Sequence, residues 1–345
     1  MREQHVLCGG LGAARNGSNA VNIDVNAAPG GPNRVNLHID HISKRLADNI
    51  PDVLTDMLEL AAYVYCADQF TSRGTSQMAG MGEKWRRQFH FKVPVRRVAL
   101  WTQPEVYEAL CDTLNFLSED EFHFEFVASS NSLPLQSYLP FEDAGAHSIV
   151  PDEVILFSGG LDSLAGTASA IMGAGKKVAL VSHQSSTMIA SRQKALVVDL
   201  RERTKMSALF PIPIRINKGN EEAVEFTQRT RSFMFATLGL IVSRMFGLND
   251  LYFYENGVVS INLPIASHVL GARASRTTHP QFLANCSKLF SLLLSADFTL
   301  RNPYLWKTKS EVVKILAESQ GADLISKTFS CTRVREATKR SQHCG

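Results

Sequence analysis

Hydrophobic and polar positions follow different rhythms on the two sides of residue 150. Before it, helices are predicted over residues 51–70 and 105–117, and strands over residues 35–40, 88–100 and 122–127. These elements follow one another without regular strand–helix alternation. The first side therefore predicts a small α+β domain over residues 35–148.

From residue 151 onward, short apolar runs alternate with helical segments. Strands are predicted over residues 154–157, 177–182, 212–216 and 251–254, and helices over residues 164–174, 191–204 and 230–246. This alternation is typical of an α/β fold with a parallel sheet, which we expect over residues 149–345. Ligands of such sheets bind beyond the carboxyl ends of the strands, so the residues that follow each strand are the candidates for function.

Two stretches show no period. Residues 1–34 are rich in Gly, Ala, Asn and Pro and are predicted to form a flexible arm. The glycine-rich residues 8–12 lie in that arm without a predicted strand before them, so we do not expect them to bind a nucleotide. Residues 129–148 are polar and contain proline, which indicates a linker.

One predicted strand runs directly into the most informative motif of the chain, and a helix follows. The motif is Ser158-Gly159-Gly160-Leu161-Asp162-Ser163. Adjacent glycines let the backbone turn and approach a ligand without a Cβ in the way, and the next helix offers free N–H groups to an anion. With two hydroxyls and a carboxylate that can hold Mg²⁺, the motif predicts a phosphate site. The alternative is a glycine turn without a ligand.

Composition narrows the class of protein. The chain has 345 residues, 45% hydrophobic and 20% charged, which fits a globular protein with two domains. A net charge of +3 is small for this length, so we do not expect nucleic acid as a partner. The longest apolar stretch, residues 233–248, is too short for a bilayer and predicts a buried helix. Scattered cysteines and the lack of an apolar core in residues 1–34 indicate a cytoplasmic protein.

Polar residues also follow the other predicted strands. His183 comes after the second strand, and Glu255 and Asn256 come after the fourth. Arg229 and Arg231 open the helix predicted between them, and arginine forks suit phosphate oxygens. The alternatives are a buried, hydrogen-bonded histidine, a solvated helix start and a carboxylate that caps the next turn.

The hexapeptide resembles the PP-loop of the N-type ATP pyrophosphatases. Residues 150–345 resemble the 7-cyano-7-deazaguanine synthases and their relatives within that superfamily. The further matching segments are His183-Gln184, Arg231-Ser232, Asn302-Pro303-Tyr304, Thr308-Lys309-Ser310-Glu311 and Thr328-Phe329-Ser330-Cys331. The resemblance implies a parallel-sheet fold of the adenine nucleotide α-hydrolase type. It also implies use of ATP and Mg²⁺, with an adenylate and pyrophosphate as products.

The resemblance implies roles for individual residues. We expect ATP to contact Ser158, Gly159, Gly160, Leu161, Asp162, Ser163, His183 and Arg231. Catalysis is expected from Asp162, Arg231 and Lys309. The substrate is expected at Glu255, Asn256, Arg276, Thr278 and His279, where the chain departs from the loop of the synthases. His183 and His279 are candidates for the base that an attacking amine requires.

The resemblance also implies a zinc site with four cysteines, opened by Cys331. Only Cys344 follows before the chain ends at Gly345, and two thiolates do not complete tetrahedral Zn²⁺. We expect an incomplete zinc site at Cys331 and Cys344, in a chain cut inside the motif. The alternatives are a lost site or two ordinary thiols.

The extra N-terminal domain resembles that of long relatives in bacterial antiphage operons. That likeness implies adenylation of 7-carboxy-7-deazaguanine and amide formation with an amine of a protein encoded in the same operon. We expect the N-terminal domain to recognise that protein. Two alternatives stay open: synthesis of 7-cyano-7-deazaguanine or another PP-loop modification of nucleotides or tRNA, and a non-catalytic protein that binds a nucleotide or partner. The sequence leaves a monomer or a homodimer open.

Overall fold

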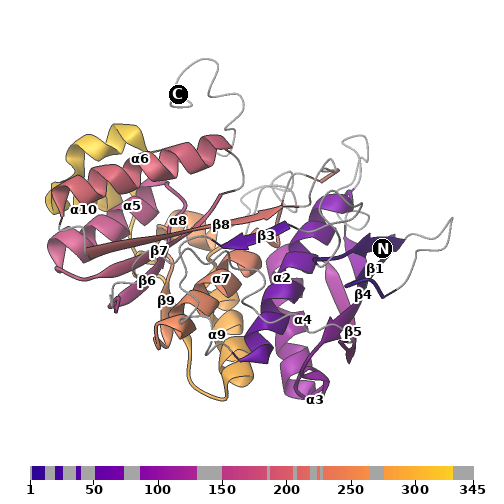
Figure 1. The fold of residues 1–345 in the computed structure, drawn as a ribbon. Coiled ribbons are helices and arrows are strands. Elements are labelled where there is room, and N and C mark those ends of the chain that lie inside the picture. Colours follow the sequence, from indigo (N-terminus) through magenta and orange to yellow (C-terminus); the bar gives the residue numbers. More distant parts are fainter. Residues whose placement is uncertain are drawn as a thin grey trace.

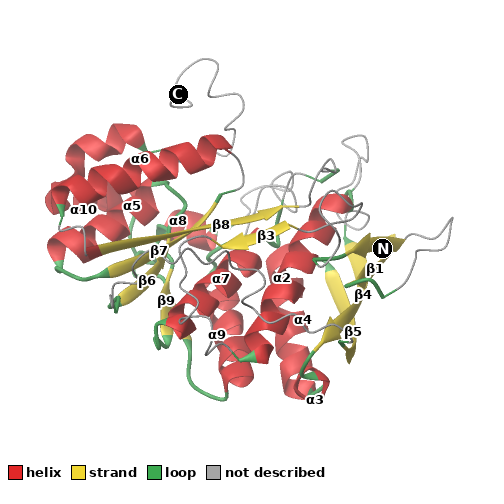
Figure 2. Cartoon of the chain, viewed as in Figure 1, coloured by secondary structure: helices red, strands yellow, loops and turns green. Residues whose placement is uncertain are grey.

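The computed structural model consists of two sheets with helices packed around them (Figure 2). It describes residues 2–11, 20–25, 36–39, 51–73, 86–129, 150–184, 187–204, 208–217, 224–225, 228–263 and 276–328. Most strands pair in parallel, so the α/β class expected for the chain is confirmed. No helix in these ranges is long and apolar enough to cross a membrane.

The first sheet has four strands in the order β2-β1-β4-β5, and every pairing in it is parallel. Its strands are β1 (Arg2–Cys8), β2 (Ala20–Ile23), β4 (Arg87–Val95) and β5 (Glu121–Ala128). Helices α2 (Asp52–Phe70) and α4 (Pro104–Ser118) lie along one face, and the short α3 (Val98–Trp101) precedes α4 (Figure 1). Period-two alternation in β4 and β5 brings phenylalanines to the buried face, where neighbouring rings stack.

The second sheet has six strands in the order β10-β9-β6-β7-β8-β3, and only β3 is antiparallel to its neighbour. Its strands are β3 (Asn36–Ile39), β6 (Glu153–Leu156), β7 (Val178–His183), β8 (Leu209–Asn217), β9 (Asp250–Tyr252) and β10 (Thr299–Arg301). Its helices are α5 (Leu161–Ala168), α6 (Thr187–Arg203), α7 (Arg231–Met245), α8 (Gly257–Ile261), α9 (Pro280–Leu294) and α10 (Lys309–Leu316). A π-helical turn lies at Ser169–Gly173, the segment Ala317–Gly321 is kinked at Ser319 and Gln320, and a 3-10 helix spans Ala322–Lys327.

Strand β6 is buried on both faces, as parallel strands usually are. Ile155 belongs to the core cluster formed with α5, α6 and α10. Val154 and Leu156 belong to the other cluster, formed with α7 and α9. The predicted apolar run of this strand is explained by these two layers of helices (Figure 1).

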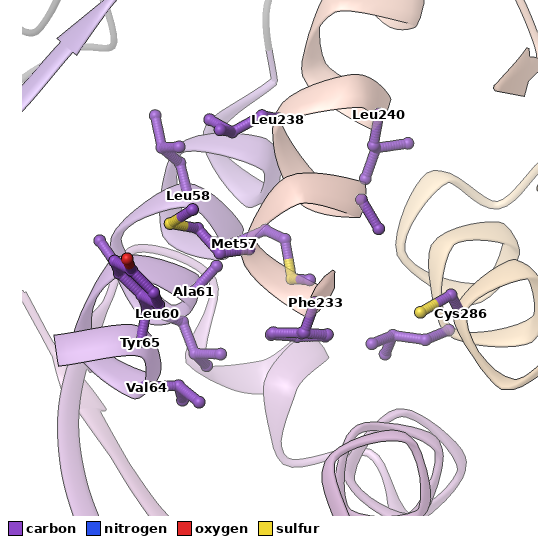
Figure 3. Packing of buried hydrophobic residues seen from close by; sticks show 14 of the residues in the cluster. Met57, Leu58, Leu60, Ala61, Val64, Tyr65, Phe233, Leu238, Leu240 and Cys286 are labelled. Atoms are coloured by element: carbon purple, nitrogen blue, oxygen red, sulfur yellow. The ribbon is translucent and has the colours of Figure 1, made fainter. Parts of the chain in front are cut away.

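The two sheets share one hydrophobic core. Helix α2 packs against α7, and α4 packs against α9. Figure 3 shows Met57 and Leu58 of α2 beside Phe233 and Leu238 of α7, all within the same buried cluster. We call the first sheet with α2, α3 and α4 the first lobe, and the second sheet with its helices the second lobe. Because their core is continuous, the lobes are halves of one folded body.

The predicted boundaries need correction in the first lobe. Residues 1–34 contain β1 and β2 in place of the flexible arm expected throughout, and the lobe has a parallel sheet rather than an α+β arrangement. Strand β3 was predicted correctly but joins the second sheet. The β1 signal is weak because this strand buries only Gln4, Val6 and Cys8, one of them polar. The expected linker lies almost entirely outside the described residues.

Buried charged residues stabilise the interface between the two lobes, which we call the joint. Arg87 of β4 pairs with Asp68 of α2 at 2.5 Å and with Asp120 at 2.6 Å. Asp68 Oδ2 also accepts hydrogen bonds from the backbone N–H and the hydroxyl of Thr230, both at 3.1 Å, and thereby caps α7 from the first lobe. Burial opposes ionisation of Asp68, but Arg87 and Arg73 outweigh it and lower its pKa.

Candidate functional site

The expected phosphate turn joins β6 to α5 at the carboxyl edge of the second sheet. Gly159 has a φ of +82°, in the left-handed region that favours glycine. Gly160 is the N-cap of α5, and no side chain caps that helix. Ser158 Oγ accepts a hydrogen bond from the Gly160 N–H at 3.2 Å, and Ser163 Oγ donates to the Gly160 carbonyl at 3.0 Å. The N-terminus of α5, where the helix dipole is positive, lies at this turn and can attract an anion.

Asp162 lies in the first turn of α5 with 5% of its side chain exposed. Its Oδ2 accepts hydrogen bonds from Lys309 Nζ at 2.8 Å and from Asn256 Nδ2 at 3.0 Å. Its Oδ1 is buried and receives no N–H donor from the described residues, and the Glu255 carboxyl group also lies within hydrogen-bonding reach of Asp162. A buried carboxylate oxygen that lacks a donor is costly unless a ligand or cation meets it.

Glu255 places a second carboxyl group beside Asp162. Burial and the neighbouring Asp162 raise the pKa of Glu255 to about 9. The pKa of Asp162 is lowered: burial opposes this, and contacts with Glu255 and Lys309 outweigh the burial. The structure thus brings Asp162, Glu255, Asn256 and Lys309 together, as the expected site requires.

Local sequence explains how these residues reach the turn. Asn256 Oδ1 accepts from the Val259 N–H at 3.2 Å, so Asn256 caps α8 and its amide nitrogen is free to face Asp162. Asn302 Nδ2 donates to the Glu255 carbonyl at 2.9 Å. Lys309 is the first residue of α10, whose start is fixed by a capping box between Thr308 and Glu311.

The expected substrate residues divide into two groups. Thr278 is buried and its hydroxyl lies 3.0 Å from Ser260 Oγ, which donates to the Glu255 carbonyl at 3.2 Å. Arg276 instead donates to Glu119 Oε1 at 2.6 Å and stacks over the Phe116 ring. Thr278 therefore belongs to the site, whereas Arg276 is used in the joint.

His279 also belongs to the joint. Its ring packs on Phe116 at 5.1 Å, and its Nδ1 accepts the Gln281 N–H at 3.1 Å, which caps α9. The expectation that Arg276 and His279 contact substrate stays a prediction, and in this structure both side chains contact the first lobe. Local sequence predicts a loop at these residues but contains no information on their partners in the first lobe.

His183 is buried, with 1% of the residue exposed. Its Nε2 lies 3.3 Å from the Ile216 carbonyl, and its ring meets Tyr65 of α2 edge to face. Burial, followed by the charge of Arg231, lowers the pKa of His183 to about 4. A base this weak and this enclosed does not suit proton removal from an amine, so the alternative of a buried, hydrogen-bonded histidine is the better description.

Arg231 lies at the N-terminus of α7, and this end of the helix lies at the carboxyl edge of the sheet because α7 runs back to the start of β9. It is half-buried, and no described residue forms a hydrogen bond or ion pair with its guanidinium. Neighbouring Arg229, by contrast, pairs with Glu119 at 3.0 Å. Of the two arginines, Arg229 is therefore engaged with the first lobe.

Gln193 of α6 is a site residue that sequence reasoning missed. Its side chain lies beneath the turn and contacts backbone carbonyls there, including that of Ser158 at 3.2 Å. A lone glutamine in a helical pattern carries no signal of this role.

Metal binding is an expectation that the described ranges do not show. There, no group of three or more His, Cys, Asp or Glu side chains is placed to hold a metal. Cys331 and Cys344, the expected zinc ligands, lie outside the described residues.

Comparisons with known proteins leave the family open. No family profile and no curated protein matches the chain. A ketoreductase domain from the bacillaene assembly line is 12% identical, covering 93% of this chain and 86% of its own, with a TM-score of 0.26. A C2-type ketoreductase from a modular polyketide synthase is 12% identical over 84% of this chain and 78% of its own, with a TM-score of 0.22. Similarities this low carry no argument about fold or activity.

Proposed function

We propose that the chain is an ATP pyrophosphatase that activates the carboxylate of a 7-deazaguanine as its adenylate and transfers the acyl group to an amine. The observation that carries the proposal is the glycine turn between β6 and α5, which places the N-terminus of α5 and the buried carboxyl group of Asp162 together at the carboxyl edge of the sheet. The resemblance of residues 150–345 to the 7-cyano-7-deazaguanine synthases supports the substrate class. The protein acceptor and the link to antiphage defence belong to the same proposal.

The residues at the turn fit ATP with Mg²⁺. The amides of Gly160 and Leu161 and the hydroxyls of Ser158 and Ser163 would hold the β- and γ-phosphates. Asp162 Oδ1 would bind Mg²⁺, which neutralises charge on the phosphates when bound. Lys309 and Arg231 add positive charge at the same edge of the sheet.

In the first step, a carboxylate oxygen of the substrate attacks the α-phosphorus, and the bond between that phosphorus and the bridging oxygen breaks. Pyrophosphate leaves with the electron pair, and its new charge is met by the turn, Lys309 and Arg231. The enzyme supplies orientation and charge stabilisation, since no covalent bond to the protein is needed.

In the second step, a neutral amine attacks the acyl carbon and the bond to AMP breaks, giving an amide. The amine loses one proton. Because His183 and His279 are both engaged elsewhere, we assign this proton to solvent or to the leaving phosphate of AMP. The zinc expectation rests on Cys331 and Cys344 and forms no part of this chemistry.

The proposal is tested by pyrophosphate release from ATP with 7-carboxy-7-deazaguanine, with and without candidate amines, followed by mass spectrometry of the product. We expect release that depends on the deazaguanine and is lost in Asp162→Ala. Lys314→Ala, on an exposed lysine of α10, is the matched control. A nitrile product would favour the 7-cyano-7-deazaguanine synthase alternative, and no release with any carboxylate would contradict the proposal.

A further inference from the structure

The side chain of Gln193 connects the ends of two neighbouring strands beneath the phosphate turn. Its Nε2 lies 3.2 Å from the Ser158 carbonyl and 3.4 Å from the Phe157 carbonyl, at the end of β6. The same nitrogen lies 3.5 Å from the His183 carbonyl, at the end of β7. A side-chain amide has two N–H donors, so one group can hold both strand ends.

The aliphatic part of Gln193 also shapes the turn. A Cβ added to Gly159 would lie 3.2 Å from Gln193 Cγ, which is closer than ordinary packing allows. The glycine backbone therefore rests directly on this side chain, in the conformation with φ of +82°. One residue of α6 thus supports the turn both by hydrogen bonds and by contact.

A purely structural role does not explain why this residue is a glutamine. The residue is 3% exposed, and its Oε1 is buried without a partner. An unmatched buried acceptor is unfavourable, and a leucine or methionine would fill the same space without it. The cost of the unmatched oxygen must be offset by the hydrogen bonds of the amide nitrogen. These hydrogen bonds all go to backbone carbonyls around the turn.

We propose that Gln193 is a positioning residue that holds the backbone of Ser158, Gly159 and Gly160 in the shape that receives the β- and γ-phosphates. The inference rests on the proposed function, because the ligand of the turn is ATP. Gln193 acts through the turn and does not itself contact the nucleotide. Its loss should therefore affect ligands that carry a pyrophosphate group and spare those that do not.

The test is calorimetric titration of the full chain with ATP, inorganic pyrophosphate and AMP, each with Mg²⁺. For Gln193→Leu we expect the Kd of ATP and of pyrophosphate to rise about tenfold, the equivalent of one lost hydrogen bond, with the Kd of AMP nearly unchanged. Gln193→Glu should bind ATP and pyrophosphate even more weakly than Gln193→Leu, because a carboxylate cannot donate hydrogen bonds to the carbonyls. Lys194→Leu, on the exposed neighbour in α6, should match the wild type.

The outcomes separate this inference from the proposed function. Equal weakening of ATP and AMP in Gln193→Leu, or no change in either, would overturn the positioning role while leaving the ATP site intact. If the wild type binds neither ATP nor pyrophosphate, the proposed function and the inference both fail. Thermal unfolding of each variant checks folding, and Gln193→Met, of similar length, replaces the leucine variant if that one is unfolded.

Discussion

In each lobe, a turn with two adjacent glycines follows a parallel strand. The two turns differ in the residues that surround them. After β1, Gly9 donates its N–H to the Ile23 carbonyl at 2.9 Å, and an added Cβ would lie 2.5 Å from Pro94 Cγ. After β6, the second glycine opens α5, whose amides have no side-chain cap. Glycine is needed in the first turn for packing; in the second turn, we propose that it lets a ligand approach the backbone. The surroundings, not the glycines, indicate which turn has a function.

Two buried aspartates repeat the contrast. Asp68 has charged or hydrogen-bonded partners on both carboxylate oxygens, from Arg87 and Thr230. Asp162 accepts from Lys309 and Asn256 on Oδ2 and lies against the Glu255 carboxyl group, and no N–H group of the described residues reaches its Oδ1. Full pairing of Asp68 between the lobes indicates a structural role. For Asp162 at the turn, we propose that a ligand meets the remaining oxygen.

The largest expected effect on stability comes from removing Asp68, the fully paired aspartate. Asp68→Ala leaves the buried Arg87 with one carboxylate partner fewer. It also removes the acceptor for the backbone N–H and the hydroxyl of Thr230. We expect a loss of about 3–5 kcal/mol in the free energy of unfolding, measured with urea. Lys92→Met, which removes an exposed ion pair with Glu125, is the control and should cost under about 1 kcal/mol. Equal losses in both variants would contradict a special role for the buried network.

The next effect concerns His183, which is neutral in the folded chain. Its pKa of about 4 lies below the value of about 6.5 expected when unfolded, so the unfolded chain binds a proton first as the pH falls. The stability from this group is complete above pH 6.5 and is lost toward pH 4, by about 3 kcal/mol.

This pH dependence is measured against His183→Asn, which does not titrate. We expect the difference in unfolding free energy between wild type and variant to shrink between pH 6.5 and pH 4. A difference that stays constant over this range would show that His183 is not held neutral by burial.

A smaller effect compares the two glycine turns directly. Gly9→Ala adds a Cβ at a φ of +60° against Pro94, and we expect it to destabilise the fold by about 1–3 kcal/mol without changing ATP binding. Gly159→Ala should weaken ATP binding. Calorimetry and urea unfolding of both variants measure the two effects, and loss of ATP binding in Gly9→Ala alone would reverse the assignment.

The smallest effect on stability is expected for Lys309→Met. Its side chain is 43% exposed, so its pair with Asp162 contributes under about 1 kcal/mol after solvent screening. Pyrophosphate release should nevertheless fall at least about tenfold, if Lys309 stabilises charge in the transition state. Unchanged release would remove Lys309 from the catalytic residues.

The second lobe could be predicted from sequence because its strands are buried on both faces and its turn carries a specific motif. Glu255 and Asn256 were predicted because they follow a strand, and Lys309 because its segment matches the family motif; the structure places Asn256 and Lys309 in contact with Asp162. Strand β1 was missed because few of its side chains are buried. Its alternation of polar and apolar residues is too short to stand out from the surrounding Gly and Asn.

Pairings between the lobes could not be predicted. Arg276 and His279 have the residue types of a substrate loop. In the structure, however, Arg276 donates to Glu119 and His279 packs on Phe116, both in the first lobe. Nothing in local sequence identifies such distant partners. Gln193 was missed for the same reason, because its role depends on two strand ends that meet only in the fold.

The most direct test of the central claim is amide hydrogen exchange of the full chain with and without ATP and Mg²⁺. We predict slower exchange at residues 159–163 when ATP is present, and no change at residues 9–11 after β1. Slower exchange at residues 9–11 with none at residues 159–163 would contradict the assignment of the nucleotide site to the second lobe.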